Sequence, residues 1–176
     1  MSSGPVEFLI LTSGMYMVLL MVTLTFALMT GSMLRQSTET RLHEISNQIA
    51  ADIIEAYSLC YQTKSGDAQV FRPMEIPASV NTYGYVVSLQ LENDSWVVRV
   101  SLETTQTISS ESPLWGKSSG VRIETGNGTL IIDSYPITYS AYLHSGTSAP
   151  GTRLSPVVWA SRLGDKIRVG IGVIKS

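Results

Sequence analysis

The chain has 176 residues and a formal net charge of −2, with 12 Lys and Arg against 14 Asp and Glu. It has no run of basic residues, which argues against a nucleic-acid partner, because phosphates are bound by a basic surface. The single cysteine, Cys60, excludes an intramolecular disulfide, and we expect its thiol to be buried. The two histidines, His43 and His144, have no cysteine or second histidine at ligand spacing. We therefore expect no metal site and no cofactor.

The first predicted element is a long apolar helix. Residues 8–34 are 27 residues without one Asp, Glu, Lys, Arg or His, and Glu7 stands directly before them. As an α-helix this stretch would be about 40 Å long, more than the ~30 Å hydrocarbon core of a membrane. A secretory signal fits less well, because its apolar part is usually about 7–15 residues long and follows a basic stretch. Residues 1–34 therefore form an N-terminal segment with a helix that can cross a membrane.

The composition of this helix favours contact between copies of it. Five of the seven methionines lie in it, together with several Gly, Ala, Ser and Thr. Small residues let helices approach closely, and methionine fills irregular gaps. An ordinary membrane span is the alternative interpretation. The residues expected at the contacts between helices are Phe8, Leu11, Met15, Leu19, Thr23, Ala27 and Thr30.

The helix is predicted to continue beyond its apolar part as an amphipathic extension, residues 35–59. This stretch contains no Pro or Gly, and its apolar residues recur at steps of three and four. We expect one continuous helix from about Pro5 to Leu59. The predicted apolar stripe is Leu42, Ile45, Ile49, Ile53 and Ala56.

Residues 60–82 are interpreted as a linker, because Pro73 and Pro77 disfavour a helix there. Residues 83–176 then form the head domain, with alternating and β-branched residues that predict about seven strands. Hairpins are expected across Asn93-Asp94, across Gly126-Asn127-Gly128 and across 162–165. The predicted fold class is α+β: a long N-terminal helix followed by an antiparallel, immunoglobulin-like β-sandwich.

Two long polar stretches, 104–119 and 144–155, are expected to be exposed loops of this domain. Asn93 and Asn127 each begin an N-glycosylation sequon in a predicted turn, so both are possible modification sites. The three tryptophans are expected to pack in the core. The sequence contains no G-x-S-x-G, no H-E-x-x-H and no phosphate-binding glycine loop, and an arrangement of Ser and Asp around His144 has little support. We expect no enzyme and assign no catalytic residue.

A small-residue start, a glutamate, an apolar helix, an amphipathic extension and a β-rich domain together resemble the type IV pilin superfamily. The opening S-G-P-V-E-F-L-I-L, Ser3 to Leu11, looks particularly like archaeal type IV pilins and archaellins. Counted from Ser3, Glu7 holds the fifth position, where that family carries its glutamate. The resemblance implies that Ser3 is the mature N-terminus and that its ammonium group pairs with Glu7 of a neighbouring copy, which sets the register between subunits. Only Met1-Ser2 precede Ser3 where the family has a short basic leader, so Met1 stays open as the first mature residue.

The local sequence gives Glu7 a second interpretation, as part of a helix start. Gly4 would be the cap, Pro5 would hold the first helical position, and the Glu7 carboxylate would lie near the positive end of the helix dipole. The resemblance implies a structural subunit, a pilin, of an extracellular filament. Its partners would be copies of itself, a prepilin peptidase, an assembly ATPase with its membrane platform, and cell surfaces or an envelope layer; it would lie in the membrane before assembly. The alternative is a single-span membrane-anchored surface protein, including a minor pilin or an archaellum stator component.

Overall fold

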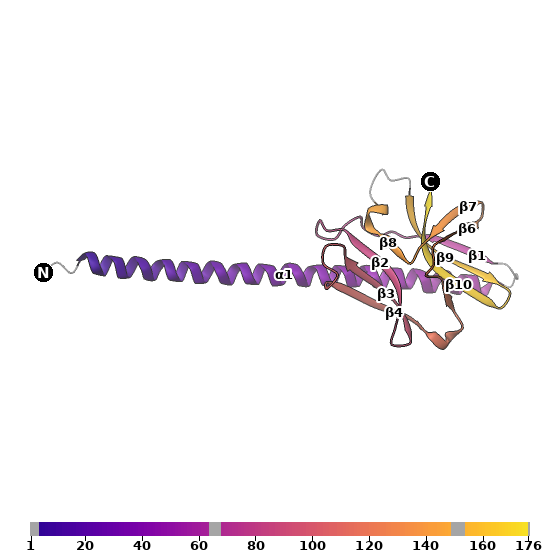
Figure 1. The fold of residues 1–176 in the computed structure, drawn as a ribbon, viewed down its shortest axis with the longest axis horizontal. Helices are drawn as coiled ribbons and strands as arrows, with labels where there is room; N and C mark the ends of the chain where they lie inside the picture. Colours follow the sequence, from indigo (N-terminus) through magenta and orange to yellow (C-terminus); the bar gives the residue numbers. More distant parts are fainter. Residues whose placement is uncertain (1–3, 64–67, 149–153, 176) are drawn as a thin grey trace. The chain divides into compact units, whose positions relative to one another are not determined.

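The computed structural model describes residues 4–63, 68–148 and 154–175, and Figure 1 traces their elements. One long helix, α1 (Gly4–Gln62), precedes ten strands and two short 3-10 turns, η1 (Lys117–Ser119) and η2 (Ser145–Ser148). The predicted α+β class is therefore confirmed. By their contacts the residues form two compact units, Met1–Thr38 and Glu39–Ser176. The second unit, termed the β domain, includes the last turns of α1 as well as all the strands.

Helix α1 runs without a break for 59 residues, as the absence of Pro and Gly from residues 35–59 and their helical periodicity predicted. It passes the expected end at Leu59 by three residues. Its last turn contains no basic residue of its own. Instead Arg162, from strand β9 (Leu154–Leu163), donates from Nη1 to the carbonyl oxygens of Thr63 at 3.1 Å and Tyr61 at 3.5 Å. A guanidinium at this position satisfies carbonyls that a helix end leaves unpaired and complements the negative end of the dipole.

A four-stranded antiparallel sheet has the order β4-β3-β2-β8. The predicted hairpin between its two central strands is confirmed, and its turn consists of Asn93 and Asp94 with φ of 47° and 59°. Both residues adopt the left-handed conformation that a two-residue hairpin turn requires. The strands are β2 (Tyr85–Glu92), β3 (Ser95–Leu102), β4 (Ser109–Gly116) and β8 (Tyr142–His144).

A six-stranded sheet has the order β1-β9-β10-β7-β6, and a short strand β5 pairs with β10 in parallel. The long hairpin of β9 and β10 is confirmed; it turns at Gly164, with φ of 62°, and Asp165. The strands are β1 (Gln69–Pro73), β5 (Arg122–Ile123), β6 (Gly128–Ile132), β7 (Tyr135–Tyr139), β9 (Leu154–Leu163) and β10 (Lys166–Lys175).

The main core of the β domain is shared by both sheets and one face of α1. Figure 1 shows the strands gathered around the part of the helix that belongs to this domain. The predicted stripe is buried throughout, and it packs with residues such as Val87 and Val100 of one sheet and Val169 and Ile171 of the other. Each buried Leu or Ile of the stripe contributes about 1.5–3 kcal/mol of transfer free energy. An immunoglobulin-like sandwich is not confirmed, because a helix face completes the core between the sheets. The buried stripe residues are Leu42, Ile45, Ile49, Ile53 and Ala56.

A second, smaller core lies on the other face of the six-stranded sheet, around the fully buried Trp159. Phe71 on β1 and Tyr135 on β7 are separated by two strands in the sheet, yet their ring centroids lie 5.7 Å apart. The sheet therefore curls around this core. Gly170 stands opposite Trp159, and a Cβ at this position would lie 2.7 Å from the indole ring. Glycine is needed there because the indole covers the strand.

The structure corrects three expectations for the strands. The hairpin predicted across Gly126-Asn127-Gly128 is wrong: β5 pairs with β10, and β6 pairs with β7 across Asp133-Ser134. Both turn residues have positive φ, 49° and 71°, although neither is a glycine. The stretch 104–119, expected as a loop, contains β4. Residues 60–82, interpreted as a linker, contain the end of α1 and strand β1, so the compact unit begins at Glu39 and not at Tyr83.

Candidate functional site

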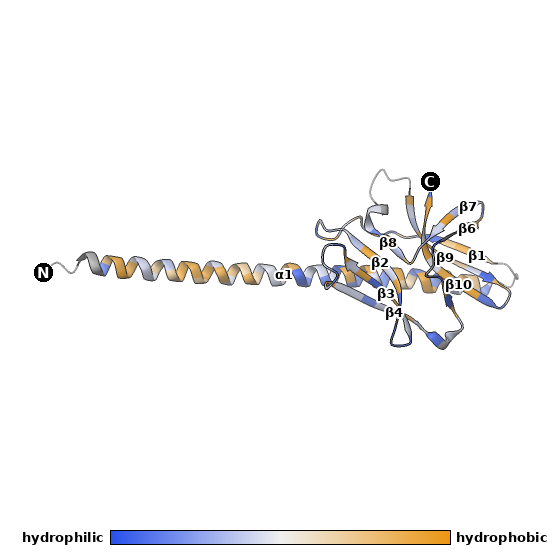
Figure 2. Cartoon of the chain, viewed as in Figure 1, coloured by the Kyte–Doolittle hydropathy of each residue, from blue (hydrophilic) through white to orange (hydrophobic). Residues whose placement is uncertain are grey.

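The first candidate site is the apolar segment of α1, Phe8–Leu34, which Figure 2 shows as a nearly continuous hydrophobic run along the helix. Its side chains are exposed, with only Thr12 half-buried. Met15 exposes 78% of its surface and Phe8 69%. By length and composition this helix can cross a membrane, with a mean hydropathy of 2.0 in its most apolar part. It is a candidate membrane anchor or signal sequence, and its surface requires an apolar environment.

The hydroxyl groups of this segment bond to the backbone of their own helix. Thr12 Oγ1 donates to the Phe8 carbonyl at 2.6 Å, and Thr23 Oγ1 donates to the Leu19 carbonyl at 2.9 Å. In apolar surroundings an unpaired hydroxyl would cost free energy, and this back-bonding removes most of that cost. The surface that the segment offers is therefore apolar despite its Ser and Thr content. The same pattern holds for Ser13, Thr25, Thr30 and Ser32.

The residues predicted to contact other helices follow one another at steps of three and four, so they lie along one side of α1. Their contact with further copies stays a prediction. All of them are exposed, and the methionines of the segment are exposed as well. The predicted contact residues are Phe8, Leu11, Met15, Leu19, Thr23, Ala27 and Thr30.

Glu7 lies in the first turn of α1 and is exposed. Its carboxylate stands near the amino end of the helix, where the dipole favours negative charge. This agrees with the local role derived for Glu7. Ser3, its expected partner from a neighbouring copy, lies outside the described residues.

Cys60 is fully buried, as expected, and its Sγ donates to the Ala68 carbonyl oxygen at 3.4 Å. Burial raises the pKa of the Cys60 thiol. Both sequon asparagines are exposed: Asn93 in the β2–β3 turn and Asn127 just before β6. Their exposure permits glycosylation, which stays a prediction. Trp159 is buried, whereas Trp96 and Trp115 are partly buried against the main core.

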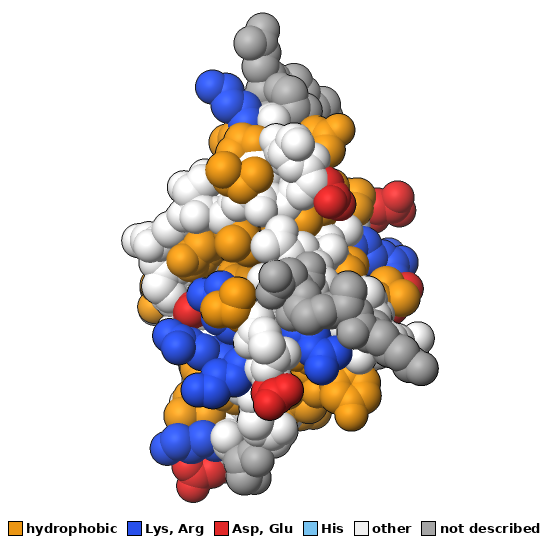
Figure 3. Space-filling view, turned by 90° about the vertical axis from the view of Figure 1, so that its right-hand side faces the viewer, with side chains coloured by type: hydrophobic (Ala, Val, Ile, Leu, Met, Phe, Trp, Pro, Cys, Tyr) orange, Lys and Arg blue, Asp and Glu red, His pale blue; other side chains and the backbone are white. Residues whose placement is uncertain are grey.

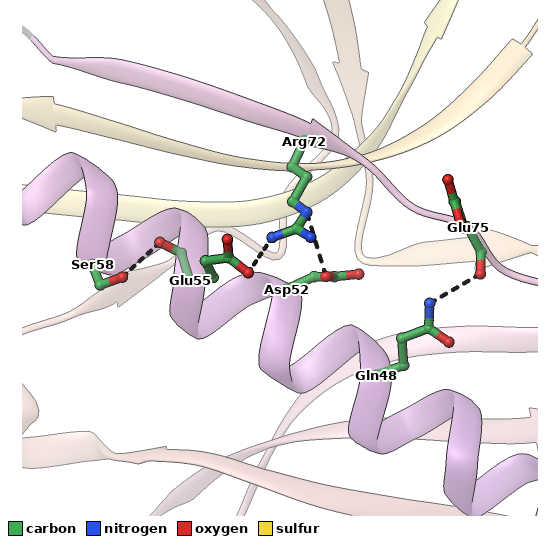
Figure 4. Close-up of polar contacts among 6 residues, drawn as sticks. All are labelled: Gln48, Asp52, Glu55, Ser58, Arg72 and Glu75. Atoms are coloured by element: carbon green, nitrogen blue, oxygen red, sulfur yellow. Dashed lines mark hydrogen bonds and ion pairs between the residues drawn. The ribbon is translucent and has the colours of Figure 1, made fainter.

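A polar cluster joins the helix extension to strand β1 (Figure 4). Arg72 of β1 pairs with Glu55 and with Asp52 of α1, at 3.7 Å from the latter. One turn away, Gln48 Nε2 donates to the Glu75 carbonyl oxygen at 3.1 Å. Burial raises the pKa of Asp52, and the nearby Arg72 opposes this shift while Glu55 adds to it. The cluster aligns β1 on the helix.

The second candidate site is a cleft on the outer face of the four-stranded sheet, with a volume of about 550 Å³. Its walls come from alternate positions of β2, β3 and β8 and from the loop after β3. His144 Nδ1 lies 2.9 Å from Glu103 Oε1, so the one histidine considered for catalysis is paired with a glutamate. Sequence analysis did not identify this cleft, although the alternation of polar with buried residues along 86–90 and 97–101 is a usable signal for an outer face. Lining residues include Ser88, Gln90, Arg99, Glu103, Tyr142 and His144.

Lys and Arg side chains also gather on the side of the molecule that Figure 3 shows. Within the β domain, Arg122 of β5 and Arg162 of β9 have structural partners. Arg162 holds the end of α1, and Arg122 lies 3.3 Å from Glu124. These contacts use the charges of Arg122 and Arg162 within the domain.

Within residues 4–63, 68–148 and 154–175, no group of three or more His, Cys, Asp and Glu could hold a metal ion. The described residues therefore offer two candidate sites: the exposed apolar surface of α1 and the polar cleft on the four-stranded sheet. Comparisons of the chain with protein-family models, with curated proteins and with solved structures find no match.

Proposed function

We propose that this protein is the structural subunit of an extracellular filament of the type IV pilus kind. In this proposal the apolar segments of many copies pack together in the filament centre, and the β domains lie outside, available for contact with surfaces. Before assembly the same segment lies in the membrane. The subunit itself performs no chemical reaction.

The observation that carries the proposal is the apolar segment, 27 residues with exposed side chains and internally bonded hydroxyls. At about 1.5 Å per residue it is roughly 40 Å long, longer than a ~30 Å membrane core requires. Its exposed methionines and small residues suit helix contacts of irregular shape better than contact with lipid alone.

A second feature that supports the proposal is the continuity of α1 from the apolar segment into the β domain. The same α1 that carries the apolar segment supplies one face of the main core of the β domain. A helix that only anchored the β domain to a membrane would not need to form part of the core of that domain. The Glu7 position relative to Ser3 is the further resemblance to pilins described above.

The second candidate function is a single-span membrane-anchored surface protein, and the capacity of α1 to cross a membrane favours it. Electron microscopy of material sheared from cells that express the full chain separates the two proposals. Filaments composed of this chain, identified by mass spectrometry and lost when the gene is deleted, are expected for a pilin. If the chain stays with the membrane fraction and sheared material holds no such filament, the anchor proposal replaces the filament proposal.

A further inference from the structure

The cleft on the outer face of the four-stranded sheet is built from side chains that are ordered before any ligand arrives. Gln90 Nε2 donates to Ser88 Oγ at 3.1 Å, and Ser88, almost fully buried, donates in turn to the Arg99 carbonyl oxygen at 3.4 Å. Arg99 Nη2 also reaches Ser109 Oγ at 3.5 Å. This network links β2, β3 and β4, and such preorganisation lowers the entropy that binding costs.

The two charged side chains of the cleft, Arg99 and Glu103, each have a polar partner. Arg99 Nε lies 3.4 Å from Glu111 Oε1, and Glu103 accepts from or pairs with His144 at 2.9 Å. An anion would compete with Glu111 for the guanidinium, and a cation would compete with His144 for the carboxylate. The cleft is therefore suited to a neutral ligand that both donates and accepts hydrogen bonds.

The Glu103 carboxylate lies directly over the backbone of Gly84. A Cβ at Gly84 would lie 2.6 Å from Glu103 Oε2, so the carboxylate occupies space that only glycine leaves open. The Glu103 backbone nitrogen also donates to the Gly84 carbonyl oxygen at 3.0 Å. The carboxylate thus lies at the wall of the cleft, paired with His144 and next to the open space that Gly84 provides.

We infer that this cleft binds a neutral saccharide through Gln90, Arg99, Glu103 and Tyr142. Planar amide, guanidinium and carboxylate groups can each hydrogen-bond to two neighbouring hydroxyls, and together they supply both donors and acceptors. Tyr142, which exposes 58% of its surface, offers an aromatic face to the C–H side of a sugar ring. The cleft volume of about 550 Å³ lies within the ordinary range for small-ligand sites. The inference goes beyond the proposed filament, because every residue involved belongs to the β domain.

The test uses the full chain in a zwitterionic detergent without a sugar headgroup, since maltoside detergents would compete for the cleft. Saturation-transfer NMR and titration calorimetry are run with maltotriose, mannotriose and chitotriose, and with inorganic phosphate as the anion probe. At least one trisaccharide is expected to bind, and phosphate is expected neither to bind nor to compete. Binding of phosphate alone, or of no trisaccharide up to millimolar concentration, overturns the inference.

Variants locate the binding. Tyr142→Ala is expected to weaken binding about five- to tenfold. Its matched control is Tyr135→Ala, which removes a tyrosine of similar exposure from the other sheet and should leave affinity unchanged. Gly84→Ala keeps every charge but displaces the Glu103 carboxylate, and it should weaken binding as Glu103→Gln does. Circular dichroism checks that each variant folds. Equal affinity in all variants that fold would place the sugar elsewhere and overturn the inference.

A last arm identifies the source of the sugar. The trisaccharide that binds is compared with a long polymer of the same sugar. A polymer that binds at least about tenfold more tightly per trisaccharide unit points to a surface polysaccharide, of which the cleft contacts a longer stretch. Equal affinity for both points to a free oligosaccharide. Either result agrees with a saccharide cleft and names the form of its ligand.

Discussion

Ser46 on helix α1 and Ser112 on strand β4 share a hydrogen bond of 2.8 Å between their side-chain oxygens, inside the β domain. Both residues are almost fully buried. Ser112 also donates to Asn47 Oδ1 at 2.6 Å, and two residues earlier on the same strand Ser110 Oγ lies 3.0 Å from His43 Nδ1. The polar side of the helix extension is thus covered by a serine-rich strand, and hydrogen bonds replace apolar packing at this seam.

The hydrogen bond between Ser46 and Ser112 predicts that substitutions of these two residues have non-additive effects on the free energy of unfolding. Ser46→Ala and Ser112→Ala should each lower the free energy of unfolding by about 1 kcal/mol, because each leaves a buried hydroxyl with one partner fewer. The double variant should lose less than the sum, since the bond between the two serines is lost only once and neither hydroxyl is left without the other. Urea unfolding followed by tryptophan fluorescence measures all three.

Ser58→Ala is the control on the same helix, because its hydroxyl bonds only within its own turn, to the Glu55 carbonyl oxygen. It should change stability by less than about 0.5 kcal/mol. Strictly additive losses for Ser46 and Ser112 would mean that the bond between them adds nothing.

The apolar segment predicts the effect of a charge within it. Ala27→Arg places a guanidinium on an exposed face of the segment, where an apolar partner or lipid is expected. Such a charge costs several kcal/mol in a dry environment. Filaments should be absent from sheared material, while thermal unfolding of the β domain stays unchanged. Filaments at normal yield would show that this part of α1 is not enclosed in the assembly.

Glu7→Gln separates the local role of Glu7 from the register role. As a residue of the first turn, Glu7 contributes at most about 1 kcal/mol through the helix dipole. If its carboxylate pairs with the ammonium of a neighbouring copy, removing the charge breaks a buried pair at a cost of ~3–5 kcal/mol. We expect a normal amount of membrane-resident subunit and few filaments, measured by immunoblot of both fractions.

Glu39→Gln gives the matched control, because it removes one carboxylate from the same helix outside the apolar segment. It should leave filament yield unchanged. If Glu7→Gln also yields normal filaments, Glu7 acts only at the helix start, and the resemblance to pilins loses its physical basis at this residue.

Burial of Cys60 predicts an inert thiol. Because its pKa is raised, the thiol stays protonated at neutral pH, and the protonated form is a poor nucleophile. Non-reducing gels should show no disulfide-linked dimer, and iodoacetamide at pH 8 should modify Cys60 only after urea unfolds the domain. Rapid modification of the folded protein, or a clear dimer band, would contradict the packing around Ala68.

The raised pKa of Asp52 predicts a pH-dependent gain from Asp52→Asn. The folded state holds the proton of Asp52 more tightly than the unfolded state, so stability from this group is greatest at low pH and falls as pH rises from about the ordinary value through the raised pKa. At pH 7 the variant should therefore be more stable than the parent, by less than about 1 kcal/mol since Arg72 offsets part of the burial cost. The gain should disappear below the ordinary pKa of 3.8.

Thermal unfolding at pH 7 and at pH 3.5 measures this difference. Asp165→Asn, at the exposed β9–β10 turn, serves as the control without a burial effect. A loss of stability at pH 7 in Asp52→Asn would mean that the attraction of Arg72 outweighs the burial of the carboxylate.

Strong local patterns predicted much of the fold. The continuous helix, its buried stripe and the hairpins at Asn93-Asp94 and Gly164-Asp165 follow from periodicity and turn residues that act within a few positions. Strand β4 was missed because its inward residues, Ser110 and Ser112, face polar helix residues, so the strand lacks apolar alternation. Its partner could be known only from the tertiary structure.

The turn at Asp133-Ser134 was missed for a different reason. Neither residue is a glycine, and a nearby Gly-Asn-Gly offered a stronger local signal for a hairpin. The cleft was missed because it depends on the pairing of β8 with β2, residues more than fifty positions apart in sequence. The apolar segment, in contrast, needs no tertiary contact to be recognised.

Strand β10 lies inside its sheet but is the last strand to be synthesised, so the β domain can be completed only when the end of the chain is available. Ile53 of the helix stripe precedes Ile171 of β10, which packs in the same core, by 171 − 53 = 118 residues. At about 5–20 residues per second, roughly 6–24 s separate their synthesis. Throughout that interval each nascent chain exposes both its apolar segment and the apolar stripe of α1, because β10 does not yet cover the stripe. Changes that slow the docking of β10 should therefore reduce the yield of mature protein through aggregation, even where the finished domain unfolds at the same temperature.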